Sequence, residues 1–398
     1  MTDLSAHARR AAPALLGYAA VRALGLTVLA LWSAARDKSG YTLLTARWDS
    51  LWYTRVAELG YGYEVRMPNG DIHSNLAFFP LLPWLERILA AVTPLSSADA
   101  GFLVSALASL AAAWGIFAVA DHVHGRRAGV CAVLLWAVLP VGIVQSMAYS
   151  ESLFTALATW SLYAVLTGRW VTAGTLALLA GLTRPVGLAV VAAVWAAGIA
   201  SFVRDRRAAR EGRARASEHA PSPAPGTTVP GASATRRALG MLLAPLGAAG
   251  YVLWVGHRTG GGPLGYLDVQ AGWRNGFDGG YAFARFVAEK FTSSPTALAG
   301  LALIAGVAAL VWLYIVCLRQ GQPLPLLVYA GVVLALALCA SSYFGSKPRL
   351  LLPAFPLLLP PAVALARQTT RRSAAVLGAV AVGSAVYGAF WLNGAGPP

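Results

Sequence analysis

Charged side chains are scarce in this sequence: Lys, Arg, Asp and Glu make up 12% of its 398 residues, whereas apolar residues make up 57%. That charged share is about half of what an ordinary soluble domain carries. So few charges could not cover the surface of a soluble protein of this length. The composition therefore excludes a soluble globular protein and leaves a membrane protein.

Cysteine is also scarce, and its placement excludes two kinds of site. Cys131, Cys317 and Cys339 each stand alone in an apolar run, which suits neither a zinc site nor a redox pair, so we expect small packing residues. His122 and His124 lie two residues apart, too close in sequence to meet at one ligand on a helix. The chain has no Gly-rich phosphate loop, nucleophile elbow or zinc motif. No metal and no cofactor is expected.

What the sequence has in abundance is long apolar runs, each near the roughly 20 residues that cross a bilayer core. The first run follows Arg9 and Arg10 but is too long for a signal peptide, so it is expected to remain as the first helix. The pattern predicts an all-α polytopic membrane protein of about eleven spans. They are residues 14–35, 101–120, 128–146, 150–166, 170–183, 186–203, 238–256, 297–318, 324–343, 349–366 and 373–391.

The basic residues predict an orientation. With the N-terminus inside, the inner segments carry 17 Lys and Arg against 5 Asp and Glu, while the outer segments carry 13 against 11. Cytoplasmic loops are enriched in Lys and Arg. The net charge of +15 is therefore interpreted as an orientation signal and a contact for anionic lipids, not as a nucleic-acid site. The predicted location is the plasma membrane, with the C-terminus and both long loops outside.

Residues 204–237 are rich in Ala, Pro, Ser and Arg and show no apolar periodicity, so they are predicted to form a disordered basic cytoplasmic loop. This loop separates an N-terminal membrane block, 1–203, from a C-terminal block, 238–398. The first block holds an outer loop at 36–100 and the second holds one at 257–295. Leu81 to Val92 is apolar but short and charged in the middle, which indicates an interfacial or re-entrant helix.

The first outer loop contains a short helix with tryptophan anchors at the membrane surface. Its large apolar side chains recur at helical spacing: Trp48, Trp52, Val56 and Leu59. Asp49 and Tyr53 are four residues apart and share a face. A carboxylate fixed there could act as the general base for a hydroxyl acceptor. From spacing alone, an Asp49 that caps this helix or pairs with Arg47 is the better interpretation.

A resemblance adds to this interpretation. The runs RWDSLWYTRVAELGYGYE, HSNLAFFPLLP, SMAYSESLF and LAGLTRPVGL, and more weakly VQAGWR and KPRLLLPAFPLLL, resemble in their order the phosphatidylinositol-glycan class V mannosyltransferases. That resemblance implies the GT-C membrane fold. It also implies transfer of mannose, with inversion, from a polyprenyl-phosphate donor on the outer or luminal face.

The resemblance makes Asp49 the catalytic base. Two departures from the family pattern leave the acceptor and the sugar open. A histidine common three residues after the aspartate is Trp52 here, and an Arg-Ser-Asn-Gly pattern is replaced by residues 184–187, Arg-Pro-Val-Gly.

Four further charged residues are expected at the outer membrane surface. Glu151 would hold sugar hydroxyls or orient Asp49, since a carboxylate at that depth is costly unless it has a function; the alternative is a helix-start carboxylate stabilised by the dipole. Arg184 would meet the donor phosphate or simply snorkel. Arg349, with Lys347 beside it, would grip the departing phosphate, or both would be ordinary flanking cations.

The second outer loop supplies further candidates, although its glycines suit a mobile surface loop equally well. His73, in the first loop, faces the same side, and a loop histidine with no partner is more often inert. The full set expected to contact the sugar or the acceptor is Glu151, Trp48, Tyr53, His73, Gln270, Trp273 and Arg274.

Together these features favour a GT-C glycosyltransferase of the cell envelope that uses a polyprenyl-phosphate hexose, with mannose as the implied sugar. Its acceptor would be an extracytoplasmic glycolipid, polysaccharide or protein. One rival is a lipid transporter or flippase, which would need inverted repeats and polar broken helices near the midplane. Another is a non-catalytic GT-C-like membrane subunit.

The topology is tested by labelling single cysteines in sealed cells, in a chain without Cys131, Cys317 and Cys339. Cysteines at Ser74 and Gly276 should react with an impermeant reagent from outside, because both outer loops face that side. A cysteine at Ser222 should not react. Outside labelling at Ser222 would contradict the predicted topology.

Overall fold

The computed structural model describes residues 2–218, 231–394 and 396, and these are mostly helical. The long helices are α1 (Thr2–Ala34), α5 (Ser97–His124), α7 (Ser150–Leu166), α9 (Leu188–Glu218), α14 (Ser294–Arg319), α15 (Leu324–Cys339) and α18 (Thr370–Leu392). The shorter ones are α2 (Gly40–Thr45), α3 (Asp49–Leu59), α4 (Leu81–Val92), α6 (Arg126–Ala137), α8 (Trp170–Gly181), α10 (Gly231–Leu243), α11 (Leu246–Thr259), α12 (Gly265–Gly272), α13 (Tyr281–Glu289), α16 (Lys347–Leu350) and α17 (Leu359–Arg367).

One β-hairpin and one further two-stranded antiparallel sheet lie among these helices. β1 (Glu64–Arg66) pairs with β2 (Ile72–Ser74), with Val65 opposite His73. β3 (Gly276–Phe277) pairs with β4 (Ala340–Ser341), with Gly276 opposite Ser341. The second sheet ties the second outer loop to the segment that precedes α16.

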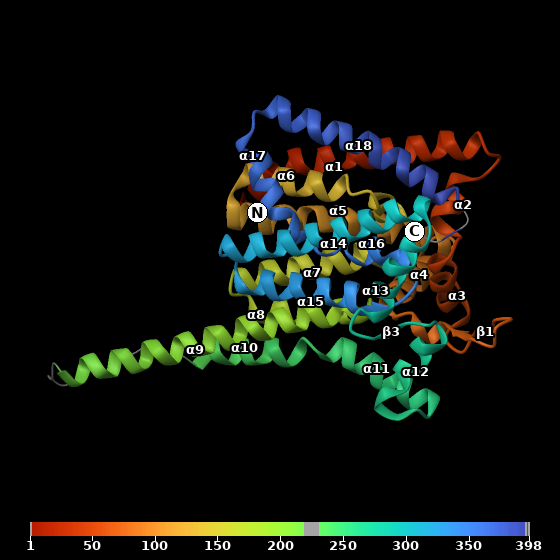
Figure 1. Ribbon diagram of the computed structural model, residues 1–398. Coiled ribbons are helices and arrows are strands. Elements are labelled where there is room, and N and C mark those ends of the chain that lie inside the picture. The colour runs from red at the N-terminus through yellow and green to blue at the C-terminus, as the bar shows by residue number, and fades with distance from the viewer. Residues whose placement is uncertain (1, 219–230, 395, 397–398) are drawn as a thin grey trace.

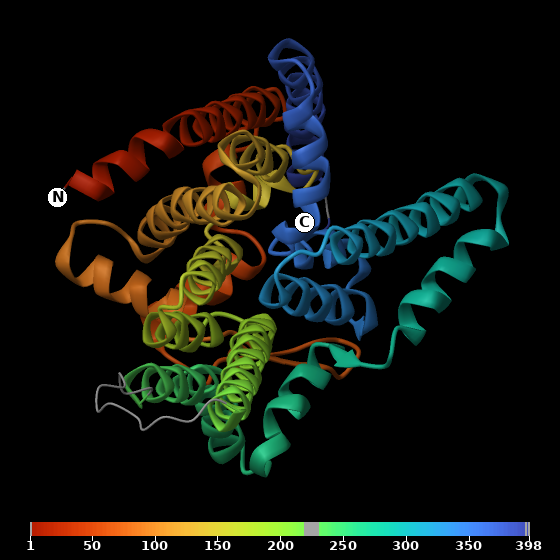
Figure 2. The ribbon, with the colours of Figure 1, turned by 90° about the vertical axis from the view of Figure 1, so that its left-hand side faces the viewer.

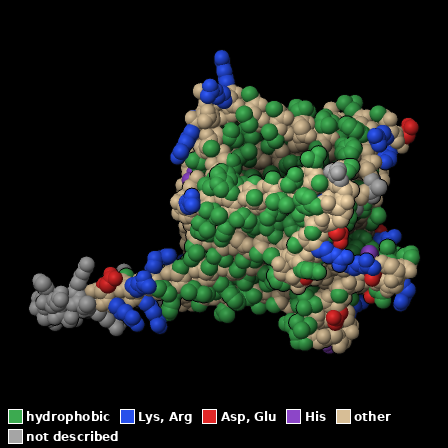
Figure 3. All heavy atoms as spheres, in the orientation of Figure 1, with side chains coloured by type: hydrophobic (Ala, Val, Ile, Leu, Met, Phe, Trp, Pro, Cys, Tyr) green, Lys and Arg blue, Asp and Glu red, His purple; other side chains and the backbone are tan. Residues whose placement is uncertain are grey.

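The helices run side by side through a bundle, and the short outer elements gather at one end of it (Figure 1). The flank of the bundle is covered with apolar side chains, whereas Lys, Arg, Asp and Glu lie mainly towards its two ends (Figure 3). Seen along the helices, α13 and α14 form a limb set apart from the other helices (Figure 2). This arrangement is that of a multi-pass membrane protein.

The predicted count of eleven spans is not confirmed. Six helices of the described chain are long and apolar enough to cross a membrane, or seven if the bent pair 344–350 and 355–367 is one span. The other predicted segments contain shorter helices. The segment 128–146, for example, breaks after Ala137, because the residue before Pro140 is disfavoured in a helix. Apolar runs therefore located the helices but not their lengths.

An intramembrane arginine compensates for this break. The guanidinium of Arg22, in the middle of α1, donates hydrogen bonds to the carbonyl oxygens of Ala137 and Gly142. Backbone groups freed inside a membrane must find partners in the protein. Arg22 thus satisfies the carbonyls at the end of α6 and in the 3₁₀ turn that follows it (Gly142–Ser146).

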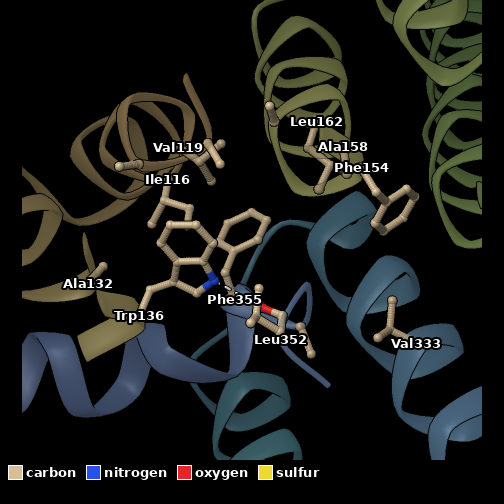
Figure 4. Close-up of a cluster of buried hydrophobic side chains, with 14 of the residues drawn as sticks. Ile116, Val119, Ala132, Trp136, Phe154, Ala158, Leu162, Val333, Leu352 and Phe355 are labelled. Carbon is tan, nitrogen blue, oxygen red and sulfur yellow. Dashed lines mark hydrogen bonds between the residues drawn. The ribbon is translucent and has the colours of Figure 1, made fainter. Parts of the chain in front are cut away.

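The core lies between α1, α6, α5, α7 and the bent segment around α17. Trp136 is fully buried, stacks on Tyr18 with ring centroids 5.5 Å apart, and donates its indole N–H to the carbonyl of Leu352 at 3.0 Å. Figure 4 shows this bond beside Ile116 and Phe355. The contact fixes the start of the bent segment, which follows α16 directly.

In the first outer loop, α4 is the short helix expected at the interface, but one of its charged residues is buried. Glu86 is 1% exposed, and neither of its carboxylate oxygens forms a hydrogen bond with the described residues. Burial raises the pKa of the Glu86 carboxyl well above its usual value, with a smaller contribution from nearby Glu58. Burial thus favours the uncharged form of Glu86. Arg87, the other charged residue of α4, donates to the Ala57 carbonyl at 2.8 Å.

The structure corrects the prediction of disorder for 204–237. α9 continues to Glu218, and α10 begins at Gly231. Residues 204–218 are rich in Ala, Arg and Glu, which are strong helix formers, so the helix extends from its apolar half without a break. The remainder of the predicted loop, 219–230, lies outside the described residues.

Two glycines allow α8 and α10 to approach closely. A methyl group at Gly174 would overlap the carbonyl of Gly240, and one at Gly240 would overlap the carbonyl of Trp170. Small residues at such crossings bring helix backbones together in membrane proteins. The crossing holds α10 against the N-terminal block.

Gly240→Ala should lower the midpoint of thermal unfolding in detergent, because the overlap with backbone costs about 1–3 kcal/mol. The matched control is Gly306→Ala in α14, where a methyl group would meet nothing within 4 Å. The control should be neutral or slightly stabilising, since Ala is the better helix former. Equal midpoints for the two variants would show that the α8–α10 contact is not tight.

Candidate functional site

Asp49 is held at the start of α3 by a constrained backbone. The preceding residue, Trp48, has φ 52° and ψ −122°, a conformation that costs a non-glycine residue on the order of 1–3 kcal/mol. The Ser50 hydroxyl accepts from the Arg47 N–H at 3.0 Å and donates to the Arg47 carbonyl at 2.7 Å. The Arg47 guanidinium lies 4.0 Å from the Trp48 ring centroid and donates to the carbonyl of Leu392. The end of α18 thus anchors the turn that presents Asp49.

Arg349 joins two carboxylates from distant parts of the chain. It lies in α16, a single turn that begins at Lys347 and has Pro348 as its second residue. Its Nη1 is 2.8 Å from Oδ2 of Asp49, and its Nε is 3.2 Å from Oε1 of Glu151. Its guanidinium also lies 5.1 Å from the ring centroid of Tyr149. The contact links α16 to the starts of α3 and α7.

Arg184 extends the same network. Its Nη1 is 2.5 Å from Oε1 of Glu151 and donates to the Ser150 hydroxyl at 3.2 Å. The hydroxyls of Ser150 and Tyr53 are hydrogen-bonded at 2.7 Å. Burial raises the pKa of the Tyr53 phenol, so it stays protonated and is no base. We call Asp49, Glu151, Arg184 and Arg349 the ion cluster.

The ion cluster is balanced in charge and uneven in exposure. Two carboxylates face two guanidinium groups, and such pairing offsets the cost of burying charge. The Glu151 and Arg349 side chains are 1% and 9% exposed, whereas that of Asp49 is 24% exposed. The Nε and Nη1 atoms of Arg349 form no hydrogen bond with the described residues, and their contacts to the carboxylates are ion pairs. Asp49 is thus the carboxylate that a substrate can reach, and Arg349 retains hydrogen-bonding capacity.

Beside the ion cluster lies a group of stacked rings that we call the aromatic wall. Its members come from three outer segments and are Trp52, Tyr63, His73, Phe78 and Trp273. The His73 and Trp273 rings are stacked with centroids 4.1 Å apart. Phe78 also contacts Tyr53, with ring centroids at 5.2 Å, and thereby connects the wall to the ion cluster.

The structure does not bring every predicted site residue to these two groups. The Lys347 ammonium donates to the carbonyls of Ala337 and Ala340, at 2.8 and 2.7 Å, and so caps α15 instead of joining Arg349. The Gln270 amide nitrogen donates to the Tyr266 hydroxyl and, at 3.4 Å, to the carbonyl of Ala77 in the first outer loop. Its amide oxygen accepts from Asn275.

Two other predicted contacts also lie apart from the ion cluster. Arg274 pairs with Asp71 at 2.5 Å on the surface. The Trp48 ring packs against the Arg47 guanidinium, so Trp48 positions Asp49 through its backbone conformation.

Sequence reasoning missed the participation of Tyr149 and Ser150, although both stand in the Tyr-Ser-Glu-Ser motif that carried the family resemblance. It also listed Trp52 only as a membrane anchor, and it gave Phe78 no role. Within residues 2–218, 231–394 and 396, no group of three or more His, Cys, Asp or Glu side chains could hold a metal ion.

The sequence comparison confirms the resemblance to a known family. Residues 31–213 match the model of the family described as Mannosyltransferase (PIG-V). Asp49, Glu151 and Arg184 lie within the matched residues. Over these residues the chain is similar to the PIG-V mannosyltransferases. No curated protein sequence matches the chain.

A solved structure confirms the fold class. ArnT from Cupriavidus metallidurans bound to undecaprenyl phosphate aligns with a TM-score of 0.50 and 15% identity, over 92% of this chain and 62% of ArnT. The apo form of the same ArnT gives 0.49 and 16%, over 83% and 56%. AglB from Archaeoglobus fulgidus, an archaeal oligosaccharyltransferase in complex with an inhibitory peptide and a dolichol-phosphate, gives 0.46 and 13%, over 96% and 56%. The chain thus spans about six tenths of these proteins, and it has the GT-C polytopic helical fold.

The balance of the ion cluster is tested with Glu151→Gln. This change leaves two guanidinium groups facing one carboxylate in a buried site, which should cost about 3 kcal/mol and lower the midpoint of thermal unfolding. Asp71→Asn is the matched control, because it breaks the surface pair with Arg274 and should cost less than about 1 kcal/mol. A Glu151→Gln midpoint as high as that of the control would show that the cluster is not a coupled buried network.

Proposed function

We propose that the protein is a membrane glycosyltransferase that transfers mannose from a polyprenyl-phosphate donor to an extracytoplasmic acceptor, with inversion at the anomeric carbon. The observation that carries the proposal is the ion pair between Arg349 and Asp49, 2.8 Å apart at the outer-loop end of the bundle. A base for a hydroxyl and a cation for a phosphate thereby meet in one site. The similarity of residues 31–213 to the PIG-V mannosyltransferases supports the choice of sugar.

In the proposed reaction, the Asp49 carboxylate takes the proton of an acceptor hydroxyl. The acceptor oxygen attacks the anomeric carbon on the face opposite the phosphate. The bond from that carbon to the phosphate oxygen breaks, and the electron pair leaves with the lipid phosphate. Asp49 ends the step protonated. General-base catalysis of this kind is worth on the order of 10²–10⁴ in rate.

Arg349 and Arg184 are the groups we assign to the departing phosphate. A guanidinium forms paired charge-assisted hydrogen bonds with phosphate oxygens, and the Nε and Nη1 atoms of Arg349 are held by ion pairs alone among the described residues. Charge that develops on the leaving group would be stabilised in a buried, low-dielectric site. ArnT, which has the same fold, was solved with undecaprenyl phosphate, a lipid of the proposed donor class.

We further propose that the protein lies in the plasma membrane with this site facing outward. The donor's lipid chain would lie between helices, where each buried methylene contributes about 0.8 kcal/mol. Lys347 has a structural role in this proposal, because its ammonium donates hydrogen bonds to carbonyls at the end of α15.

The substitution Asp49→Asn tests whether Asp49 is the catalytic base. The variant keeps the size of the side chain but cannot take a proton, so turnover with a short-chain polyprenyl-phosphate mannose should fall at least about 100-fold. Donor affinity should change little. Asp71→Asn is the matched control and should retain turnover, because Asp71 is an outer carboxylate as exposed as Asp49 but pairs with Arg274. Near-normal turnover in purified Asp49→Asn would exclude Asp49 as the base.

Substitutions at Arg349 test whether its guanidinium binds the phosphate of the donor. Arg349→Lys should retain part of the turnover and Arg349→Ala much less, since only the first keeps a charge, although a lysine cannot reproduce the paired geometry. The turnover rate should fall more than the affinity for the donor if the contact between Arg349 and the phosphate becomes stronger as the phosphate leaves. Arg285→Ala, on the exposed face of α13, is the control cation. Equal, near-wild-type rates for both Arg349 variants would contradict the phosphate role.

A further inference from the structure

We propose that the aromatic wall is a binding site for a pyranose ring and that the acceptor is therefore a glycan. The identity of the acceptor rests on the proposed function, whereas the existence of a pyranose site does not. Three features of the wall support this site: its shape, its position beside Asp49, and its polar groups that form no hydrogen bond with the described residues.

The wall is built around Trp52. Its ring is stacked parallel to that of Phe78, with centroids 5.6 Å apart and an angle of 6° between the planes. The ring of Trp273 meets it edge-on at 4.9 Å, and that of Tyr63 lies at 5.8 Å. Aromatic rings bury large apolar areas and hold fixed mutual geometry. The C–H face of a pyranose is apolar, so a rigid corner of rings suits it.

The wall lies next to the candidate base. Trp52 follows Asp49 by three residues in α3, and side chains three apart on a helix are neighbours. All five wall residues are half-buried, so their rings are partly open to solvent. A pyranose on the wall would therefore present a hydroxyl group to the exposed carboxylate of Asp49.

Among the polar groups of the wall, one forms a hydrogen bond within the protein and others form none with the described residues. The indole N–H of Trp273 is used, because it donates to the carbonyl of Ser74 at 3.0 Å. The indole N–H of Trp52 and the ring nitrogens of His73 form no hydrogen bond with the described residues. Small-molecule sites combine apolar surfaces with a few polar groups that set orientation. The free groups of Trp52 and His73 are suited to the hydroxyls of a sugar.

The test compares sugar and non-sugar acceptors of equal chain length. The probes are octyl mannopyranoside, octyl glucopyranoside and octyl galactopyranoside, with octan-1-ol as the plain alcohol, all below their micellar concentrations. In Trp52→Ala, the KM for the pyranoside that the wild type prefers should rise about tenfold and more than the donor KM, because a stacked ring is lost. The preference for that pyranoside over octan-1-ol should fall by a similar factor. Trp52→Phe should restore much of it.

Trp312→Ala is the matched control, since Trp312 is 62% exposed on α14 and lies outside both the ion cluster and the aromatic wall. It should behave as the wild type. An unchanged pyranoside preference in Trp52→Ala would overturn the inference while leaving the transferase function intact. So would a wild type that glycosylates octan-1-ol or a Ser-containing peptide better than every pyranoside.

Direct binding separates this inference from the proposed function. The three pyranosides are titrated calorimetrically into the Asp49→Asn protein, which binds without turnover, and into the same protein with Trp52→Ala. Binding that weakens about tenfold in the second protein supports the pyranose site even if no transfer is ever detected. Absence of binding by all three sugars would overturn the site.

Discussion

The guanidinium of Arg349 is the point on which the site depends. It is nearly buried, and the carboxylates of Asp49 and Glu151 offset the cost of burying its charge. Three segments far apart in the chain must therefore converge. The constrained backbone at Trp48 places the Asp49 carboxylate in this contact, and the bent segment that contains α16 places the Arg349 guanidinium in it.

The sequence predicted the class of fold and most of the ion cluster. Asp49, Glu151, Arg184 and Arg349 were all expected at the outer surface, because a charge at the end of an apolar run has few structural uses. The motifs could not show that Arg349 pairs with Asp49, since contacts between distant segments depend on packing. They also could not separate Lys347 from Arg349, because two cations two residues apart look alike until the turn of α16 points them in different directions.

Helix lengths and the outer loops were harder to predict for other physical reasons. Hydropathy detects apolar composition, but a proline such as Pro140 and an arginine such as Arg22 decide where a helix breaks and how its free carbonyls are satisfied. Trp52 was expected to be a membrane anchor because tryptophan is common there. Its stacking against Phe78 and Trp273, from other segments, shows that it faces the site.

The most direct test of the account is the position of a bound donor. Cryo-electron microscopy of the Asp49→Asn protein with decaprenyl-phosphate mannose should trap the complex before transfer. The account predicts the phosphate against the guanidinium of Arg349, with the anomeric carbon turned towards residue 49. A phosphate bound away from Arg349, for example at the opposite end of the bundle, would contradict it.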